Sequence, residues 1–256
     1  MFSIDLATHF VSKKAFNIIC ETIVWIYISL SISIQFIPKL LPLLDKKLNE
    51  ENMKISIIGG GNMGGAIALG LADSKSVLPQ DITVIGRSDK TLARLADANK
   101  YLNTVAGDYD SLSEADIVIV AVKPWLVEEV LKTHRDKLLS ENQLLVSVAA
   151  GITLDQLQGW TTMEKPLFRL IPNTAIAIRQ SMTFVASRNA GIEQENMILQ
   201  LFSNLGKVEL IDEKQFSAAT SLSSCGIAYA FRYIRAAMEG GVEMGLYPNQ
   251  SRDIVL

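Results

Sequence analysis

The sequence has little of the residue chemistry that marks metal sites or disulfide frameworks. Of its 256 residues, only two are cysteine and two are histidine. Cys20 and Cys225 are too far apart in the chain to indicate a disulfide framework or a metal cluster. His9 and His134 are isolated as well, and the charged neighbours of His134 are typical of a solvated helix face. We therefore expect no bound metal, and the cysteine usage favours a reducing, cytoplasmic setting.

The sequence also lacks a strong charge of either sign. Its formal net charge is −3, so there is no basic field of the kind that attracts nucleic acid. The composition therefore does not point to nucleic acid, and the chain is long enough for one large domain or two modest ones.

Residues 1–52 do not follow the pattern of the rest of the chain. Residues 18–37 are about as long and apolar as a membrane span, although Glu21 and several serines interrupt them. One interpretation is a signal anchor, which would tether the protein to a membrane. The other is that Met53 is the natural start and that an extended upstream translation supplies the leader. We favour the second, because many dinucleotide folds open with a strand two residues after the start.

A glycine-rich stretch follows directly on the first expected strand. The β-branched run Ile55–Ile58 predicts a buried parallel strand, and residues 66–71 predict a helix of small residues. Between them, Gly59, Gly61 and Gly64 have the G-x-G-x-x-G spacing, with Asn62 and Met63 inside it. In this motif the glycines permit a tight turn, a close approach of a pyrophosphate and close packing of helix on sheet. The stretch predicts a dinucleotide site at the helix N-terminus.

Strand and helix patterns alternate after this motif. Ser88 is a plausible N-cap for the helix that follows the second strand. We expect a Rossmann-type, doubly wound, mostly parallel α/β sheet, whose ligands bind beyond the carboxyl ends of the strands. The predicted strands cover residues 55–58, 82–85, 117–122, 144–148, 168–171 and 183–186, and further helices cover 89–98, 125–139 and a segment from 153.

The strand signals disappear near Ile211. Residues 212–256 are helical in pattern and rich in alanine, glycine and aromatics on more than one face, which indicates packing against a partner helix, either of this chain or of a second subunit. We therefore expect a domain at 53–211 and the start of a helical domain at 212–256, which we expect to be incomplete.

The end of the second strand favours NADPH as cofactor. An NAD site would place an acidic residue there, but the chain has Arg87 and Ser88, which can pair with a 2′-phosphate. Asp81 lies at the wrong end of the strand. NADH remains the alternative cofactor.

Three further strand ends are predicted to face the same cleft. Lys123 either contacts a ribose hydroxyl or a substrate carboxylate, or is a solvated loop residue. Asn173 either lies in the site or only stabilises its own turn. The candidate cofactor-binding residues at these ends are Ala121, Val122, Lys123, Pro124, Ala149, Ala150, Gly151 and Asn173.

From Met53 onward the chain resembles the pyrroline-5-carboxylate reductase family. The resemblance is carried in order by segments 59–64, 121–124, 150–152, 169–174, 212–213, 220–229 and 239–246. It implies NADPH-dependent reduction of 1-pyrroline-5-carboxylate to proline, the last step of proline biosynthesis. It also implies a Rossmann domain joined to a helical dimerisation domain in a homodimer or higher homo-oligomer. Finally, it implies that Glu213 lies near the cofactor.

The sequence departs from the family pattern in two places. Residues 224–227 read Ser-Cys-Gly-Ile where the family has Gly-Ser-Gly-Pro, and the family continues for several more helices. Ser223 and Cys225 are candidates for orienting the substrate, or they only pack the helix. Two alternatives stay open: another NADP-dependent dehydrogenase of the β-hydroxyacid type, and a non-catalytic nucleotide-binding relative or inactive fragment.

Overall fold

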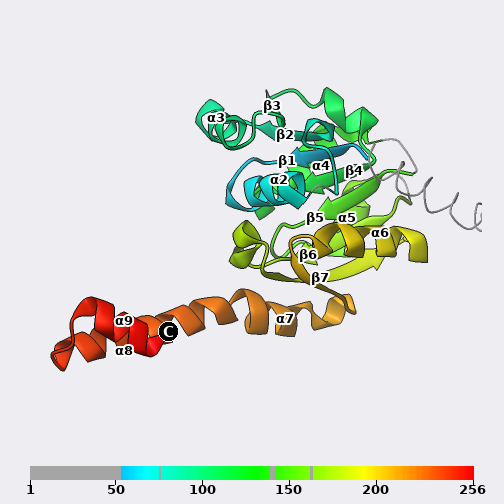
Figure 1. The fold of residues 1–256 in the computed structure, drawn as a ribbon. Coiled ribbons are helices and arrows are strands. Elements are labelled where there is room, and N and C mark those ends of the chain that lie inside the picture. The colour runs from blue at the N-terminus through cyan, green and yellow to red at the C-terminus, as the bar shows by residue number, and fades with distance from the viewer. Residues whose placement is uncertain (1–52, 75, 139–141, 162–163) are drawn as a thin grey trace, which may run out of the picture. The chain divides into compact units, whose positions relative to one another are not determined.

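A computed structural model describes residues 53–74, 76–138, 142–161 and 164–256. The hydrophobic leader at 1–52 lies outside the described residues. The described strands form one eight-stranded sheet in the order β3-β2-β1-β4-β5-β6-β7-β8 (Figure 1). They are β1 (Ile55–Ile58), β2 (Ile82–Gly86), β3 (Asn103–Ala106), β4 (Ile117–Val120), β5 (Leu144–Ser147), β6 (Leu167–Ile171), β7 (Ser181–Arg188) and β8 (Gly206–Leu210).

The sheet confirms the predicted fold class. Every neighbouring pair is parallel except β6 and β7, which are antiparallel. The central strands β1 and β4 are fully buried along their length, as apolar runs covered on both faces must be. The strand order reverses between β1 and β4, and in open α/β sheets such a reversal creates a crevice for ligands.

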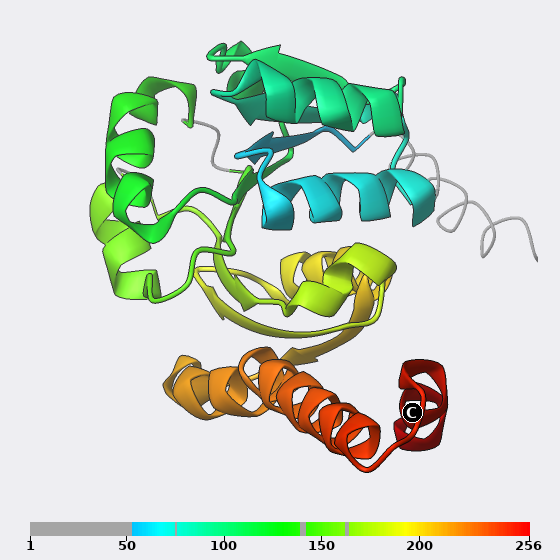
Figure 2. The same cartoon turned by 90° about the vertical axis from the view of Figure 1, so that its left-hand side faces the viewer.

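Helices cover both faces of the sheet. One core cluster contains residues of α2, α3 and α6, and the other contains residues of α4, α5 and α7. Figure 2 shows α4 (green) and α2 (cyan) on opposite sides of the strands. The helices are α2 (Asn62–Ser74), α3 (Asp89–Ala98), α4 (Pro124–Thr133), α5 (Leu154–Trp160), α6 (Ile192–Ser203), α7 (Phe216–Ala219), α8 (Gly226–Glu243) and α9 (Pro248–Val255).

Several predicted boundaries were wrong. The helix expected at 125–139 ends at Thr133 and is followed by a short 3₁₀ turn at Arg135–Lys137. Ser88 does occupy the N-cap position of α3, but its side chain makes no capping hydrogen bond. Neither β3 nor α6 was predicted. The strand β3 is half-exposed and carries no continuous apolar run that would reveal it.

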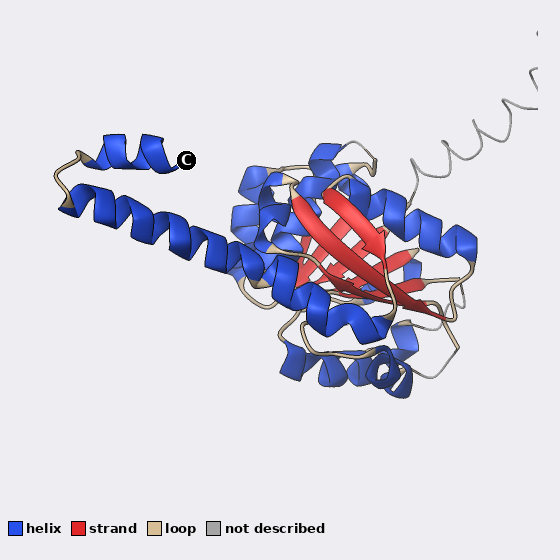
Figure 3. Ribbon diagram, turned by 90° about the horizontal axis from the view of Figure 1, so that it is seen from below, coloured by secondary structure: helices blue, strands red, loops and turns tan. Residues whose placement is uncertain are grey.

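The C-terminal helical pattern is interrupted by a π-helical segment at Thr220–Ser224, named η6. The hydroxyls of Thr220 and Ser223 donate to the carbonyl oxygens four residues earlier, which competes with regular α-helical bonding. Figure 3 shows α9 folded back beside α8, where the Ser251 hydroxyl donates to the Met238 carbonyl oxygen at 2.6 Å. Within the described residues, no helix has the length and apolar character needed to cross a membrane.

Candidate functional site

The glycine-rich turn has the geometry that the sequence predicted. Gly59 has φ of +110° and donates its N–H to the Ile85 carbonyl oxygen at 2.7 Å, so the chain leaves β1 in a conformation that favours glycine. A Cβ on Gly64 would overlap the Gly59 carbonyl oxygen, which confirms that α2 lies tightly against the turn. A Cβ on Gly61 would meet nothing within 4 Å, so the surface of the turn is open there.

A cleft of about 560 Å³ lies over this turn. Its volume is within the range of ligand-binding clefts. It joins the turn to the carboxyl ends of β2, β4 and β5, which the sequence analysis had singled out. The predicted residues that line it are Gly59, Gly61, Asn62, Met63, Arg87, Ser88, Ala121, Val122, Lys123, Pro124, Ala149 and Ala150.

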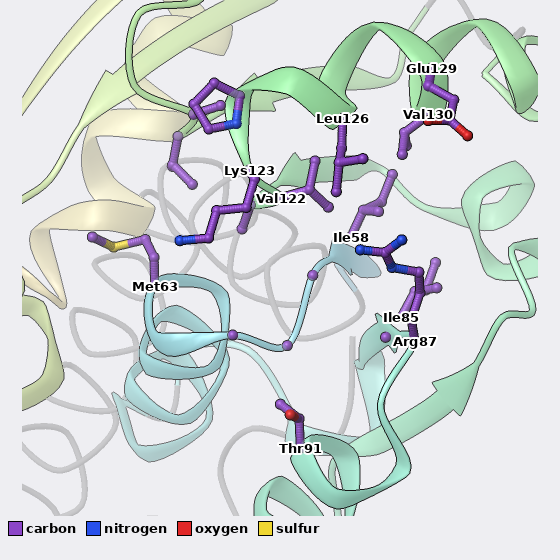
Figure 4. Close-up of a pocket in the computed structure, with 18 of the residues that line it drawn as sticks. Ile58, Met63, Ile85, Arg87, Thr91, Val122, Lys123, Leu126, Glu129 and Val130 are labelled. Atoms are coloured by element: carbon purple, nitrogen blue, oxygen red, sulfur yellow. The ribbon is translucent and has the colours of Figure 1, made fainter.

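Two cations reach this cleft from different strand ends. Figure 4 shows the Lys123 ammonium group above the glycine turn, on the side of Met63. The Arg87 guanidinium lies farther along, near Ile58, and is directed toward α4. Open backbone at a helix N-terminus, together with cations on both sides, fits the phosphates of a dinucleotide. The residues present therefore suit an NADP-type cofactor.

The far end of the cleft contains a contact that the sequence analysis missed. His134, which follows α4, stacks on Tyr109 with ring centroids 3.6 Å apart and an interplanar angle of 13°. Burial is the main cause that lowers the pKa of His134 below its usual value, and Lys137 adds to it. His134 is only partly buried by this contact, and its neighbours Lys132, Arg135 and Asp136 are exposed, as the sequence analysis expected. Tyr109 and His134 are 25 positions apart, and nothing in the local sequence pairs them.

Some candidate residues lie elsewhere. Gly64 packs behind the turn and does not line the cleft, and neither does Gly151. Asn173 is buried; its side-chain oxygen accepts from the Ala175 N–H at 3.1 Å, and its amide faces the Ser223 carbonyl oxygen at 3.4 Å. The turn-stabilising role considered for Asn173 is therefore present. Ser223 and the exposed Cys225 lie at η6, outside the cleft.

Comparisons with known proteins agree with this geometry. Residues 54–151 match the family described as NADP oxidoreductase coenzyme F420-dependent, and residues 213–256 match pyrroline-5-carboxylate reductase dimerisation. The pyrroline-5-carboxylate reductase of Pisum sativum is 35% identical over 85% of this chain and 76% of its own length. The chain belongs to the pyrroline-5-carboxylate reductase family.

Solved structures of this reductase family share the fold. The Plasmodium falciparum enzyme, crystallised with NADP bound, has a TM-score of 0.72 at 27% identity, covering 80% of this chain and 75% of its own. The Coxiella burnetii pyrroline-5-carboxylate reductase has a TM-score of 0.74 at 27% identity, covering 80% and 76%.

In this reductase chain Glu213 joins three elements. One carboxylate oxygen accepts from Arg169 on β6 at 2.8 Å and from the Leu154 N–H at the start of α5, also at 2.8 Å. The Arg169 guanidinium also lies 4.6 Å from the centre of the Phe216 ring on α7. Glu213 does not line the cleft, so its expected place beside the cofactor stays a prediction. Its contacts tie the C-terminal helices to the sheet.

We expect Glu213→Gln to lower the free energy of unfolding by about 2 kcal/mol, because Arg169 would lose its counter-charge in a largely buried position. Urea denaturation of the full chain measures this loss. The control is Glu239→Gln, which removes an exposed ion pair with Arg235 and should leave the free energy of unfolding almost unchanged. Equal losses in the two variants would contradict a structural role for the Glu213 contacts.

Proposed function

We propose that this chain reduces 1-pyrroline-5-carboxylate to proline with NADPH. The observation that carries the proposal is the cleft itself, in which an open glycine turn and the cation Arg87 lie at the carboxyl ends of adjacent parallel strands. Family membership and the NADP-bound Plasmodium structure support both the cofactor and the reaction.

The residues of the cleft have separate tasks in this proposal. Backbone N–H groups at the start of α2 hold the diphosphate, and Arg87 with Ser88 holds the 2′-phosphate. The small residues Ala149 and Ala150 leave room for the nicotinamide ring beside the backbone. When bound there, NADPH would supply a hydride for the imine carbon of the protonated substrate, whose nitrogen would keep its proton. Catalysis then rests mainly on positioning, for which no acid–base pair is required.

We also propose a division of the chain into an NADP-binding domain at 53–211 and part of a dimerisation domain at 212–256, which would form a homodimer. The match of 213–256 to the dimerisation family supports this division. So do the large apolar side chains that α8 exposes, namely Tyr229 at 67%, Phe231 at 62% and Tyr233 at 75%.

The direct test uses the purified full chain with pyrroline-5-carboxylate and NADPH, following the absorbance of the reduced cofactor. Oxidation that depends on the substrate supports the proposal. Binding of NADPH without any turnover would overturn it and leave a non-catalytic nucleotide-binding relative.

Arg87→Ala should weaken NADPH binding by about 1.5–3 kcal/mol, because it removes a charge-assisted contact to the 2′-phosphate. Binding of NADH, which lacks that phosphate, should change much less. Titration of the nicotinamide fluorescence measures both affinities. Lys90→Ala removes an equal charge from the first turn of α3, outside the cleft, and should leave both affinities unchanged. Equal losses of NADPH and NADH in Arg87→Ala would show that Arg87 does not read the phosphate.

A further inference from the structure

The outer half of the cleft is formed by one face of α4. Four of its residues line the cleft at a spacing of i, i+3, i+4 and i+7, which places them along a single stripe of the helix: Leu126, Glu129, Val130 and Thr133. Two of these side chains are aliphatic and two are polar. The stripe therefore presents an apolar wall with a polar rim.

Residues of other elements line the cleft beside this wall, and we call the space between them the slot. Ile85 at the end of β2 adds apolar surface, and the Arg87 guanidinium is directed toward α4 (Figure 4). The stacked rings of Tyr109 and His134 line the far end. Where the diphosphate lies over the glycine turn, the adenosine half of a dinucleotide extends toward the end of β2. We expect a purine ring to lie there with its faces on the aliphatic groups and its edge at the rim.

Glu129 differs from the other polar groups on the rim of this slot because its side chain is a carboxylate. An ionised carboxylate only accepts hydrogen bonds, whereas hydroxyl groups both donate and accept. Its neighbour Glu128 pairs with Lys132 at 2.6 Å. Glu129 makes no hydrogen bond or ion pair within the part of the chain that the structure describes, and Figure 4 shows it on α4 above Arg87.

We propose that Glu129 selects adenine by accepting a hydrogen bond from its exocyclic amino group. This inference rests on the proposed function and adds a specificity determinant to the same site. Hypoxanthine carries a carbonyl oxygen where adenine carries the amino group, so a carboxylate placed against that position meets an acceptor instead of a donor, and the one new donor, N1–H, lies at the neighbouring ring position. Arg87 would read the 2′-phosphate and Glu129 the base.

The test compares NADPH with reduced nicotinamide hypoxanthine dinucleotide phosphate, in which a carbonyl oxygen replaces the amino group and the neighbouring N1 carries a proton. Dissociation constants are measured on the full chain by nicotinamide fluorescence, so no turnover is needed. We expect the wild-type protein to prefer NADPH by about tenfold. In Glu129→Gln the preference should fall close to one, because an amide can donate to the carbonyl oxygen as well as accept from the amino group.

Glu128→Gln is the matched control. It makes the same change of charge one position away, on a residue that pairs with Lys132 and does not line the cleft. Its preference should equal that of the wild-type protein, and circular dichroism should show all three proteins folded. Equal binding of the two nucleotides by the wild type, or an unchanged preference in Glu129→Gln, would overturn the inference and leave the proposed function intact, since substrate-dependent turnover tests that function separately. Absence of NADPH binding by the folded wild-type chain would overturn both.

Discussion

Gly61→Ala should weaken NADPH binding by about tenfold or more while leaving the thermal unfolding midpoint unchanged. In the free protein a methyl group at this position meets nothing within 4 Å, and Gly61 does not have a positive φ. The same methyl group would stand on the open surface of the turn, where we place the diphosphate. It would keep the phosphates from the backbone N–H groups at the start of α2.

Gly64→Ala is the matched variant, because it adds the same methyl group behind the turn. There the Cβ would overlap the Gly59 carbonyl oxygen and lie 2.9 Å from the Cβ of Ala121. Backbone and sheet must move apart to accept it, so we expect a loss of about 3 kcal/mol in unfolding free energy.

The two glycine variants separate binding from folding. Calorimetry gives the unfolding midpoint of each, and nicotinamide fluorescence gives the dissociation constant for NADPH. A Gly61→Ala protein that binds NADPH as tightly as the wild type would contradict the placement of the diphosphate over this turn. A Gly64→Ala protein with an unchanged midpoint would contradict the packing that we assign to α2.

The glycine turn could be predicted from the sequence because its physical demands are local. A buried parallel strand must be an apolar run, and the turn that leaves it needs residues without a Cβ at fixed spacing. The residues after β2, β4 and β5 could also be predicted, since parallel strands bring their carboxyl ends to one edge. Most of the lining of the cleft follows from these two rules alone.

The elements that the sequence did not predict have no such local sequence requirement. The strand β3 reads Asn-Thr-Val-Ala and is half-exposed, so it shows neither an apolar run nor clean alternation. The π-helical turn at η6 depends on whether neighbouring hydroxyls bond back to the chain, and helical spacing does not reveal that choice. The helical pattern expected from residue 212 onward is therefore confirmed, but it did not show the π-helical turn.

The remaining features that the sequence did not predict are contacts between residues distant in sequence. The pairing of Glu213 with Arg169 spans 44 positions, and the stacking of Tyr109 on His134 spans 25. Each contact arises only after the sheet has brought its elements together. Asn173 was a candidate for the cleft because it follows β6, whose carboxyl end lies at the same edge of the sheet as that of β5. The structure buries its side chain, which accepts from the Ala175 N–H and faces the Ser223 carbonyl oxygen, 50 positions away in the sequence.

Lys165 is the second residue for which we expect a large effect, through the pH dependence of stability. Its side chain is 1% exposed, and its ammonium group donates to the Leu138 carbonyl oxygen at 2.5 Å and to Gln143 Oε1 at 3.1 Å. The amide of Gln143 is itself held by the carbonyl oxygens of Leu112 and Ala115. No carboxylate among the described residues forms an ion pair with Lys165, so burial lowers its pKa to about 8.

The sign of the effect follows from the proton count. An unfolded lysine has a pKa of about 10.4. Between about pH 8 and pH 10.4 the unfolded chain therefore binds a proton that the folded chain has lost. The free energy of unfolding therefore rises with pH across this interval. At pH 7 both states are protonated, and the folded protein bears a cost of about 3 kcal/mol that disappears above the upper value.

Lys165→Met tests this account, since it keeps much of the side-chain volume and removes the charge. Urea denaturation at a series of pH values gives the unfolding free energy of each protein, and the difference between wild type and variant isolates Lys165 from other groups that titrate at alkaline pH. We expect the unfolding free energy of the wild type to rise relative to that of the variant from pH 8 upward. The carbonyl groups that lose their partner in Lys165→Met shift the variant's curve by a constant amount and do not affect this trend. Lys132→Met makes the same substitution at an exposed lysine of α4 and is the matched control for the loss of a buried one. A wild-type curve parallel to that of Lys165→Met would mean that the buried ammonium group keeps its proton through this interval.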